Sequence, residues 1–228
     1  MAAVVDHDDI SARLLQHADV IVERIIAARH VVIDGALGAA FAANMREACS
    51  TVEKAKSTIS VGTAQLTDEL KRDDSVAFLK KSTDATVVAY MTAVGELRVV
   101  LEARLELRSD STSFMCAEYA AGAKGYVKHR DAAPERPSGR KLSILYYLNP
   151  SWTASDGGEL LLWPSDSDDC LTISPLNDRM VVFASSLEHQ VLPTSAPRLA
   201  VTAWLYNRLE LGLELIAEKR RLRREGED

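Results

Sequence analysis

Hydrophobic positions in the first half of the chain recur at helical spacing. Apolar residues at every third or fourth position after Asp8 and Asp9 predict one amphipathic helix over residues 9–29. A short strand is predicted at 31–34, followed by a second helix over 37–49. A longer third helix is predicted to begin after Asp84. This half of the chain is therefore expected to be mainly helical.

The pattern changes at Ser113. From there, short runs rich in Val, Ile, Tyr, Trp and Leu alternate with Gly, Pro, Asp and Ser, which is typical of consecutive β-strands. A last helix follows, with Leu209, Leu213 and Ile216 on one face. This order predicts an α+β fold: a double-stranded β-helix, or jelly-roll, with N-terminal helices packed on one sheet and a C-terminal helix.

A single domain over residues 1–228 is the expectation for this length. Residues 1–108 are assigned to helical support and a loop, 109–208 to the jelly-roll core, and 209–228 to the closing helix. The stretch from Thr51 to Leu70 is polar and weakly periodic, so it is interpreted as a mobile loop.

Composition narrows the cellular setting. The net charge of −6 gives no general case for nucleic acid or anionic membranes, and the basic run 219–224 is interpreted as a solvated helix end. Three cysteines without paired spacing indicate reduced thiols rather than a disulfide framework. The N-terminus lacks an apolar stretch of signal-peptide length, and no segment approaches a membrane span. We therefore expect a cytoplasmic monomer, with the nucleus as an open alternative, that binds neither nucleic acid nor membranes.

The candidate chemistry begins with His129 and Asp131, followed 58 residues after the Asp by His189. Two imidazoles and one carboxylate can occupy one face of an iron(II) ion and leave the other positions open for substrate and dioxygen. Because alternate residues of a strand point the same way, an extended His129-Arg130-Asp131 segment would direct both ligands to one side. These three residues are the predicted metal ligands.

Arg198 lies 9 residues after His189, in a predicted strand that has Thr202 and Trp204 on the same face. A guanidinium near the metal suits a dicarboxylate, because its planar fork can make two charge-assisted hydrogen bonds with a carboxylate. Iron together with a dicarboxylate clamp indicates a 2-oxoglutarate-dependent oxygenase. Arg198 and Thr202 are assigned to its cosubstrate pocket.

Several motifs from about Met115 to Asn207 strengthen this interpretation. They are Tyr119, Gly125-Tyr126-Val127-Lys128-His129-Arg130-Asp131, Tyr146-Tyr147-Leu148-Asn149-Pro150-Ser151-Trp152, Gly157-Gly158-Glu159-Leu160, Trp163-Pro164, Asp178-Arg179, His189-Gln190-Val191 and Arg198-Leu199-Ala200-Val201-Thr202-Ala203-Trp204. In this order they resemble the cytoplasmic prolyl 4-hydroxylases of the hypoxia-factor type, a branch of the 2-oxoglutarate/iron(II) oxygenases.

The resemblance implies a role for each matching residue. His129, Asp131 and His189 would bind iron, and Arg198 and Tyr147 would hold the distal carboxylate of 2-oxoglutarate. Further pocket positions are implied at Tyr119, Leu145, Leu160, Val191 and Trp204. Substrate contacts are implied at Arg140, at Trp204, and at Arg72 and Asp74, the last two at the end of a mobile loop that folds over substrate.

The implied reaction converts a prolyl residue of a protein to 4-hydroxyproline. It uses iron(II) as the metal cofactor, consumes 2-oxoglutarate and dioxygen, and is supported by ascorbate. Such enzymes include oxygen sensors. The chain departs from the family at Ala132, where Asn is usual, at Ala121 and Ala123, where Gly is common, and in the loop 132–139. These departures bear on loop geometry and substrate choice.

Two alternatives stay open from the sequence. One is an oxygenase of the same fold that acts on a non-prolyl target. The other is a catalytically silent binding module that keeps the barrel. The identity of the protein substrate is not determined by one sequence.

Overall fold

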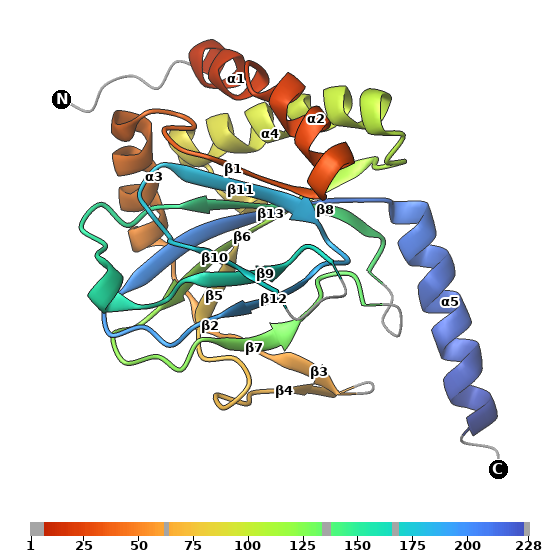
Figure 1. The fold of residues 1–228 in the computed structure, drawn as a ribbon. Helices are drawn as coiled ribbons and strands as arrows, with labels where there is room; N and C mark the ends of the chain where they lie inside the picture. Colours follow the sequence, from red (N-terminus) through yellow and green to blue (C-terminus); the bar gives the residue numbers. More distant parts are fainter. Residues whose placement is uncertain (1–6, 62–63, 134–137, 166–168, 226–228) are drawn as a thin grey trace.

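The computed structural model describes residues 7–61, 64–133, 138–165 and 169–225. Two facing β-sheets form a barrel-like core, and a layer of helices covers the outer face of the larger sheet (Figure 1). The helical elements are α1 (His7–Leu15), α2 (Ala18–Ala28), α3 (Ala39–Thr51), η1 (Leu79–Lys81), α4 (Ala85–Leu105), η2 (Ala154–Asp156) and α5 (Arg208–Glu225). This arrangement is the predicted α+β jelly-roll with N-terminal helices and a C-terminal helix.

The larger sheet has seven strands in the order β1-β11-β8-β13-β6-β5-β2. Their bounds are β1 (His30–Ile33), β11 (Arg179–Ala184), β8 (Arg140–Tyr147), β13 (Arg198–Tyr206), β6 (Ser111–Tyr119), β5 (Ser75–Phe78) and β2 (Ala55–Lys56). All neighbouring pairs are antiparallel. Alternate residues of β13 separate two environments: Leu199, Val201 and Ala203 face the helices, whereas Arg198 and Thr202 face the smaller sheet.

The smaller sheet has four strands in the order β10-β9-β12-β7. Their bounds are β10 (Leu171–Ile173), β9 (Leu160–Trp163), β12 (Glu188–Val191) and β7 (Tyr126–His129). A buried cluster that includes Leu145, Tyr147, Leu162 and Phe183 fills the space between the sheets. The candidate functional residues lie at one end of this inter-sheet layer.

The predicted single helix over residues 9–29 was wrong, because the chain forms two helices that break at Gln16 and His17. Nε2 of His17 lies 3.1 Å from the carbonyl oxygen of Ala36, so His17 connects the break between α1 and α2 to the loop between β1 and α3. Both α1 and α2 pack against α4. The third predicted helix is confirmed, and the Asp84 side chain caps it by accepting from the amides of Thr86 and Val87.

The prediction of a loop from Thr51 to Leu70 was also wrong. This stretch contains β2 and a two-stranded hairpin of β3 (Ile59–Val61) and β4 (Ala64–Leu66). The two strands do alternate apolar and polar residues, but each has only three residues, fewer than the four or more by which strands are recognised in a sequence. After the hairpin, residues 71–73 run along β7, where the amide of Val127 donates to the Lys71 carbonyl.

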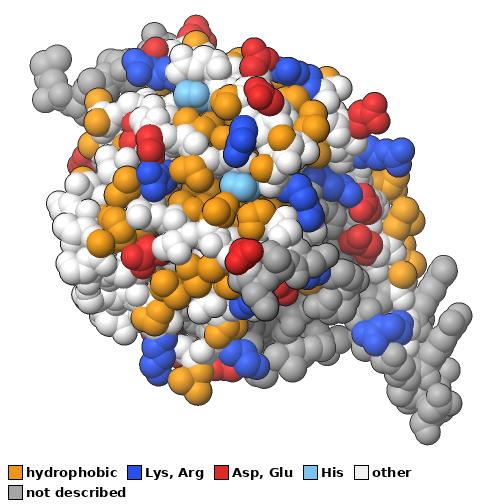
Figure 2. All heavy atoms as spheres, in the orientation of Figure 1, with side chains coloured by type: hydrophobic (Ala, Val, Ile, Leu, Met, Phe, Trp, Pro, Cys, Tyr) orange, Lys and Arg blue, Asp and Glu red, His pale blue; other side chains and the backbone are white. Residues whose placement is uncertain are grey.

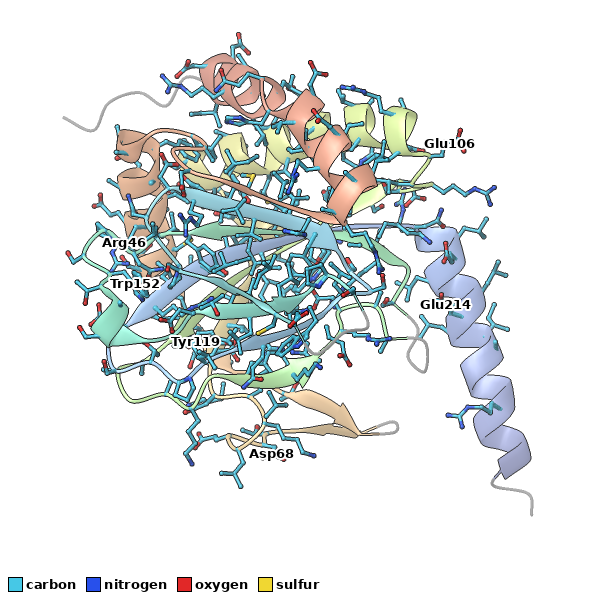
Figure 3. The ribbon with its side chains drawn as sticks, viewed as in Figure 1. Arg46, Asp68, Glu106, Tyr119, Trp152 and Glu214 are labelled. Atoms are coloured by element: carbon cyan, nitrogen blue, oxygen red, sulfur yellow. The ribbon has the colours of Figure 1, made fainter. Side chains whose placement is uncertain are left out.

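Helix α5 contacts the barrel through its first turns and extends away from it (Figure 1). Glu214 accepts hydrogen bonds from the amides of Ser138 and Gly139, and Glu210 pairs with Lys141. Figure 3 shows Glu214 on the side of α5 nearer the barrel. The predicted apolar stripe on this helix is exposed to solvent in the described structure.

The charged side chains and the cysteines are distributed as follows from the composition: charges of both signs on the surface (Figure 2), and thiols without disulfide bonds. Figure 2 shows acidic and basic side chains intermingled on the face it displays. The three cysteines are free thiols, with Cys49 and Cys116 buried and Cys170 exposed. Among the described residues, every helix is too short or too polar to cross a membrane.

Candidate metal centre

His129, Asp131 and His189 converge at one end of the space between the sheets. Pairing of β12 with β7 sets His189 directly opposite His129, and their ring centroids lie 4.1 Å apart. The Nε2 atom of His189 is 3.9 Å from Oδ2 of Asp131. One ligand atom from each of the three residues lies within 4.8 Å of the others. This spacing suits a single ion between two imidazoles and a carboxylate.

The strand argument for this pair was only partly correct. His129 is the last residue of β7, and Asp131 lies in the bend that follows the strand. The amide of Ala132 donates to the carbonyl of Ser185, which anchors the bend against the segment between β11 and β12. Asp131 therefore reaches the site through the turn of the chain after the strand rather than by strand alternation.

Backbone carbonyls orient both imidazoles. Nδ1 of His129 lies 2.8 Å from the Val127 carbonyl oxygen, and Nδ1 of His189 lies 3.1 Å from that of Leu187. A proton on each Nδ1 leaves the Nε2 lone pair available for a metal. Burial, and then the neighbouring His189, lower the pKa of His129 to about 3. The His129 imidazole is therefore neutral at neutral pH, as a metal ligand must be.

Asp131 is held as an ionised carboxylate by neighbours on the larger sheet. Its Oδ2 accepts from Ser143 Oγ at 2.6 Å and from Trp204 Nε1 at 2.9 Å. Burial by itself would raise the pKa of Asp131. Together, His189, Arg140 and His129 lower it by more than burial raises it, so the pKa lies below its usual value. Arg140 Nη1 lies 3.7 Å from the other oxygen, Oδ1. Since Oδ2 is also the oxygen that lies 3.9 Å from Nε2 of His189, the two hydrogen bonds hold it beside the ligand cluster.

Ser143 is a site residue that the sequence analysis missed. Its hydroxyl is fully buried and lies 2.9 Å from Ser185 Oγ as well as 2.6 Å from Asp131. One signal was present in the sequence: a serine interrupts an apolar strand at a position that alternates with Leu145 and Tyr147. A polar residue among inward-facing positions of a strand requires a buried partner.

We expect Ser143→Ala to weaken iron(II) binding by about 10- to 100-fold, the usual effect of losing an outer partner of a metal ligand. Anaerobic titration of iron(II) measures this. Ser143→Thr keeps the hydroxyl and serves as the control, with affinity near that of the wild type. Equal affinity in Ser143→Ala and the wild type would show that this hydroxyl does not position Asp131.

Arg198 and Tyr147 form the floor of the inter-sheet layer, and both are buried. Nε of Arg198 donates to the Gly158 carbonyl at 2.7 Å. Gly158 has φ +76°, and a Cβ there would lie 2.9 Å from Cδ of Arg198, so glycine leaves room for the guanidinium. The Arg198 carbon Cζ lies 5.0 Å from the Tyr147 ring centroid and 5.2 Å from that of Tyr119.

Two buried donors in this layer lack an acceptor. Nη2 of Arg198 and the hydroxyl of Tyr147 have no hydrogen-bond partner among the described residues. Burial raises the pKa of Tyr147 despite the opposing charge of Arg198, so its hydroxyl stays protonated. Unsatisfied buried donors are costly, and a bound carboxylate would supply acceptors for both. These residues fit the carboxylate end of 2-oxoglutarate.

The remaining predicted pocket residues also lie in this layer. Tyr119, Leu145, Leu160 and Val191 belong to the same buried cluster as Tyr147, and Figure 3 labels Tyr119 there. Thr202 is buried on β13, directly opposite Leu145 of β8. The predicted cosubstrate residues are therefore neighbours in space.

Trp204 and Arg140 lie beside the metal cluster. Cζ of Arg140 is 4.0 Å from the Trp204 ring centroid, and the indole of Trp204 donates to Asp131. The Arg140 side chain is 31% exposed, so it forms part of the rim of the site. Trp204 thus contacts both a candidate ligand and the rim.

Arg72 and Asp74 form a bidentate ion pair, with Nε–Oδ1 at 2.7 Å and Nη2–Oδ2 at 3.0 Å. Asp74 is buried, and Cζ of Arg72 lies 4.8 Å from the Tyr126 ring centroid. Tyr126 stacks on His129 with centroids 3.6 Å apart and an interplanar angle of 19°. Tyr126 received no role from the sequence, although it stands three residues before His129. The stack connects the segment after the hairpin to a candidate metal ligand.

Part of the chain is similar to known proteins. Residues 114–206 match the model of the 2OG-Fe(II) oxygenase superfamily. The hypoxia-inducible factor prolyl hydroxylase of Caenorhabditis elegans is 37% identical over 99 residues, which cover 42% of this chain and 13% of that protein. The human prolyl hydroxylase EGLN3 is 29% identical over 137 residues, which cover 59% of this chain and 53% of that protein. The chain therefore spans about half or less of these curated relatives.

Solved structures show the same fold. A prolyl-4-hydroxylase of Pseudomonas putida superposes with a TM-score of 0.74 at 24% identity, covering 84% of this chain and 99% of that one. A prolyl hydroxylase of Trichoplax adhaerens, solved with a peptide fragment of the hypoxia-inducible factor oxygen degradation domain, has a TM-score of 0.76 at 23% identity. It covers 89% of this chain and 94% of that one. Residues 114–206 are therefore similar to the 2-oxoglutarate/iron(II) oxygenase superfamily and, within it, to the hypoxia-inducible factor prolyl hydroxylases.

Proposed function

We propose that this chain is a 2-oxoglutarate- and iron(II)-dependent dioxygenase that hydroxylates a prolyl residue of a protein at its 4-position. One oxygen atom of dioxygen enters the prolyl C–H bond and the other enters succinate, while 2-oxoglutarate loses carbon dioxide. The observation that carries the proposal is the pair of unsatisfied buried donors, on Arg198 and Tyr147, in the layer that ends at His129, Asp131 and His189. A metal centre and a carboxylate receptor in one layer match what this reaction requires.

In this proposal His129, Asp131 and His189 hold the iron, which with 2-oxoglutarate and dioxygen supplies the oxidising chemistry. Arg198 and Tyr147 bind the far carboxylate and thereby fix the orientation of the cosubstrate. Tyr119, Leu145, Leu160, Val191 and Thr202 exclude water around it. Ascorbate is expected to support turnover by keeping the iron reduced.

Substrate contacts are assigned to the rim of the site. Trp204 and Arg140 would border the entering proline, since both lie beside Asp131. Arg72 and Asp74 would connect the substrate segment to the site, because their ion pair packs on Tyr126 and so on His129. We extend this to closure of the stretch 51–74 over substrate; Gly62, at its centre, lies outside the described residues.

We further propose a cytoplasmic enzyme, with the nucleus as the alternative. Free thiols fit a reducing compartment, and the net charge of −6, with intermingled charges on the face shown in Figure 2, favours neither a nucleic-acid nor a membrane partner. A monomer is the simplest state for this proposal and is checked by light scattering. We also propose a role in oxygen sensing. This role requires an apparent KM for dioxygen above the cellular oxygen concentration, because only then does the rate follow the oxygen supply.

Mass spectrometry of a host lysate, treated with the protein, iron(II) and 2-oxoglutarate, tests the activity. The expected result is a protein with a proline that gains one oxygen atom, dependent on 2-oxoglutarate. Oxygen gained only on other residues would instead identify an oxygenase for a non-prolyl target. Absence of any 2-oxoglutarate turnover, together with failure to bind iron, would identify a silent binding module.

A further inference from the structure

Two of the three cysteines meet in the core that faces the helices. Cys49 lies in the last turn of α3, and Cys116 lies near the centre of β6. Both are fully buried and belong to the same apolar cluster between the helices and the larger sheet. Cys116 alternates with Met115 and Ala117, which face the other side of the sheet, so its thiol points toward the helices. The two thiols share a hydrogen bond.

A buried lysine fixes the end of α3 against β6. Nζ of Lys54 donates to the Cys49 carbonyl at 2.6 Å and lies 3.0 Å from Oε2 of Glu118. Glu118 stands two residues after Cys116, so both side chains project from the same face of β6. The Lys54 side chain is only 7% exposed. This bridge holds the backbone of one thiol residue beside the strand that carries the other.

The surroundings make the two thiols chemically unequal. The hydrogen bond with Cys49 lowers the pKa of Cys116, and the Lys54 ammonium lowers it further, against the effect of burial. The same hydrogen bond, together with burial, raises the pKa of Cys49. The thiolate is the nucleophilic form of cysteine. Cys116 is therefore the more reactive thiol, and Cys49 is the partner that keeps its proton.

A surface cavity of about 290 Å³ lies over this junction, and it gives small solutes a way in. Its lining residues are Ser50, Val52, Lys54, Ser75, Glu118 and Ala120. Ser50 follows Cys49 directly, and Lys54 bonds to the Cys49 carbonyl. A solute of the size of hydrogen peroxide can therefore come within one residue of the thiol pair.

We propose that Cys49 and Cys116 form a site of reversible oxidation, at which a hydroperoxide converts the two thiols to an internal disulfide. The Cys116 thiolate attacks one oxygen of hydrogen peroxide and becomes a sulfenic acid, while the other oxygen takes up a proton and leaves as water. The Cys49 sulfur then displaces the hydroxyl group of the sulfenic acid, which leaves as a second water with the Cys49 proton. Two thiols and one peroxide thus give one disulfide and two waters. Small thiols reverse the reaction by exchange.

The disulfide would join the two ends of the stretch 51–74. Cys49 precedes this stretch by two residues, and β5, which follows it, pairs with β6 so that Ala77 lies opposite Cys116. Disulfides in reducing compartments are usually transient and redox-sensing, which fits a pair that is free at rest. Oxidation would therefore act on the stretch to which closure over substrate is assigned. Only this consequence rests on the proposed function.

Thiol counting by mass spectrometry tests the proposal. Reduced protein, with a chelator and no added iron, is treated with a small excess of hydrogen peroxide below its unfolding temperature, then denatured and alkylated. All three thiols should be alkylated before treatment and one afterwards, and a digest should contain the Cys49 peptide joined to the Cys116 peptide. Dithiothreitol should restore all three thiols.

The Tm provides a second readout. Cys49 and Cys116 are 67 residues apart in the sequence, so a link between them restricts the unfolded chain over a long loop. Oxidation should raise the Tm by roughly 5 °C or more, and dithiothreitol should reverse the shift. Calorimetry of the oxidised protein, with and without reductant, measures it.

Cys170→Ser is the matched control. Cys170 is the exposed cysteine, next to β10, and this variant should form the same link and leave no thiol to alkylate. Cys49→Ala and Cys116→Ala should form no internal link and show no Tm shift on oxidation. If an alanine variant does not fold, the peptide map of the wild type still decides the question.

Three alkylated thiols after peroxide treatment would overturn the assignment, as would oxidation of Cys116 to a sulfinic acid without a link. A link that involves Cys170 would do the same. So would a link that forms only at temperatures where the protein unfolds, because the fold would then not bring the two thiols together. Each of these results leaves the proposed prolyl hydroxylation untouched, since neither thiol is assigned to that reaction.

Discussion

Replacement of either His129 or His189 by alanine is expected to abolish the visible charge-transfer absorption that forms when iron(II) and 2-oxoglutarate are added without oxygen. Each imidazole is directed at the ligand cluster by a backbone carbonyl on its Nδ1, so removal leaves only two protein ligands. A two-ligand site binds iron far more weakly than a site with all three. Anaerobic absorption spectroscopy of each variant measures the effect directly.

The control for this experiment is His30→Ala. His30 lies on β1 at the edge of the larger sheet, and its ring contacts the Ala28 carbonyl at 2.8 Å, outside the ligand cluster. This variant should develop the wild-type band. A band of wild-type intensity in both His129→Ala and His189→Ala would remove the ligand assignment.

The second large effect is expected at Arg198. Arg198→Ala should raise the apparent KM for 2-oxoglutarate by roughly two orders of magnitude or more, since truncating one partner of a buried charged pair typically costs about 3–5 kcal/mol. Iron(II) binding without cosubstrate should change much less, because Arg198 lies on the floor with Tyr147 and has no contact with the ligand cluster among the interactions described. Steady-state kinetics and iron titration together separate the two effects.

Tyr147→Phe is the milder companion variant. The Tyr147 hydroxyl has no protein partner among the described residues, so its removal breaks no internal hydrogen bond. Its loss should raise the same KM by about tenfold, the effect of one hydrogen bond to a charged group. A wild-type KM in Arg198→Ala, in a protein that remains folded by circular dichroism, would mean that the cosubstrate carboxylate binds elsewhere.

Local sequence signals were sufficient for most elements. The Asp84 cap and the apolar spacing after it predicted α4, and the change of pattern at Ser113 predicted the β-rich core. These signals are local, because helix caps and strand alternation depend on neighbouring residues. The same logic failed at residues 9–29, where His17 contacts Ala36 from a distant segment and the helix breaks.

The hairpin β3–β4 shows a second kind of failure. Its two strands pair with each other through backbone hydrogen bonds. Within the described part of the stretch 51–70, β2 is the element that pairs with the larger sheet. Each strand has only three residues, Ile59-Ser60-Val61 and Ala64-Gln65-Leu66, and so short a run of alternating apolar and polar residues does not identify a strand. The polar composition was therefore interpreted as a loop.

The sequence by itself determined the kinds of groups at the site: two histidines and one aspartate, an arginine in a strand, and the motifs around them. Their types and spacing were enough to predict iron and a dicarboxylate cosubstrate, because the chemistry of a ligand follows from the donor groups offered to it. The superfamily match agrees with that prediction.

Only the tertiary structure decided how these groups are supported. Ser143 reaches Asp131 because β8 pairs with β13 in the register that sets Ser143 opposite Trp204, and Ser185 comes from the segment after β11. The contact of Arg72 with Tyr126, which stacks on His129, likewise requires residues 71–73 to run along β7. Strand register between distant segments is a property of the whole sheet, since a shift by one residue would turn every side chain to the other face. For that reason the outer partners of the metal ligands could be recognised only once the strands were paired.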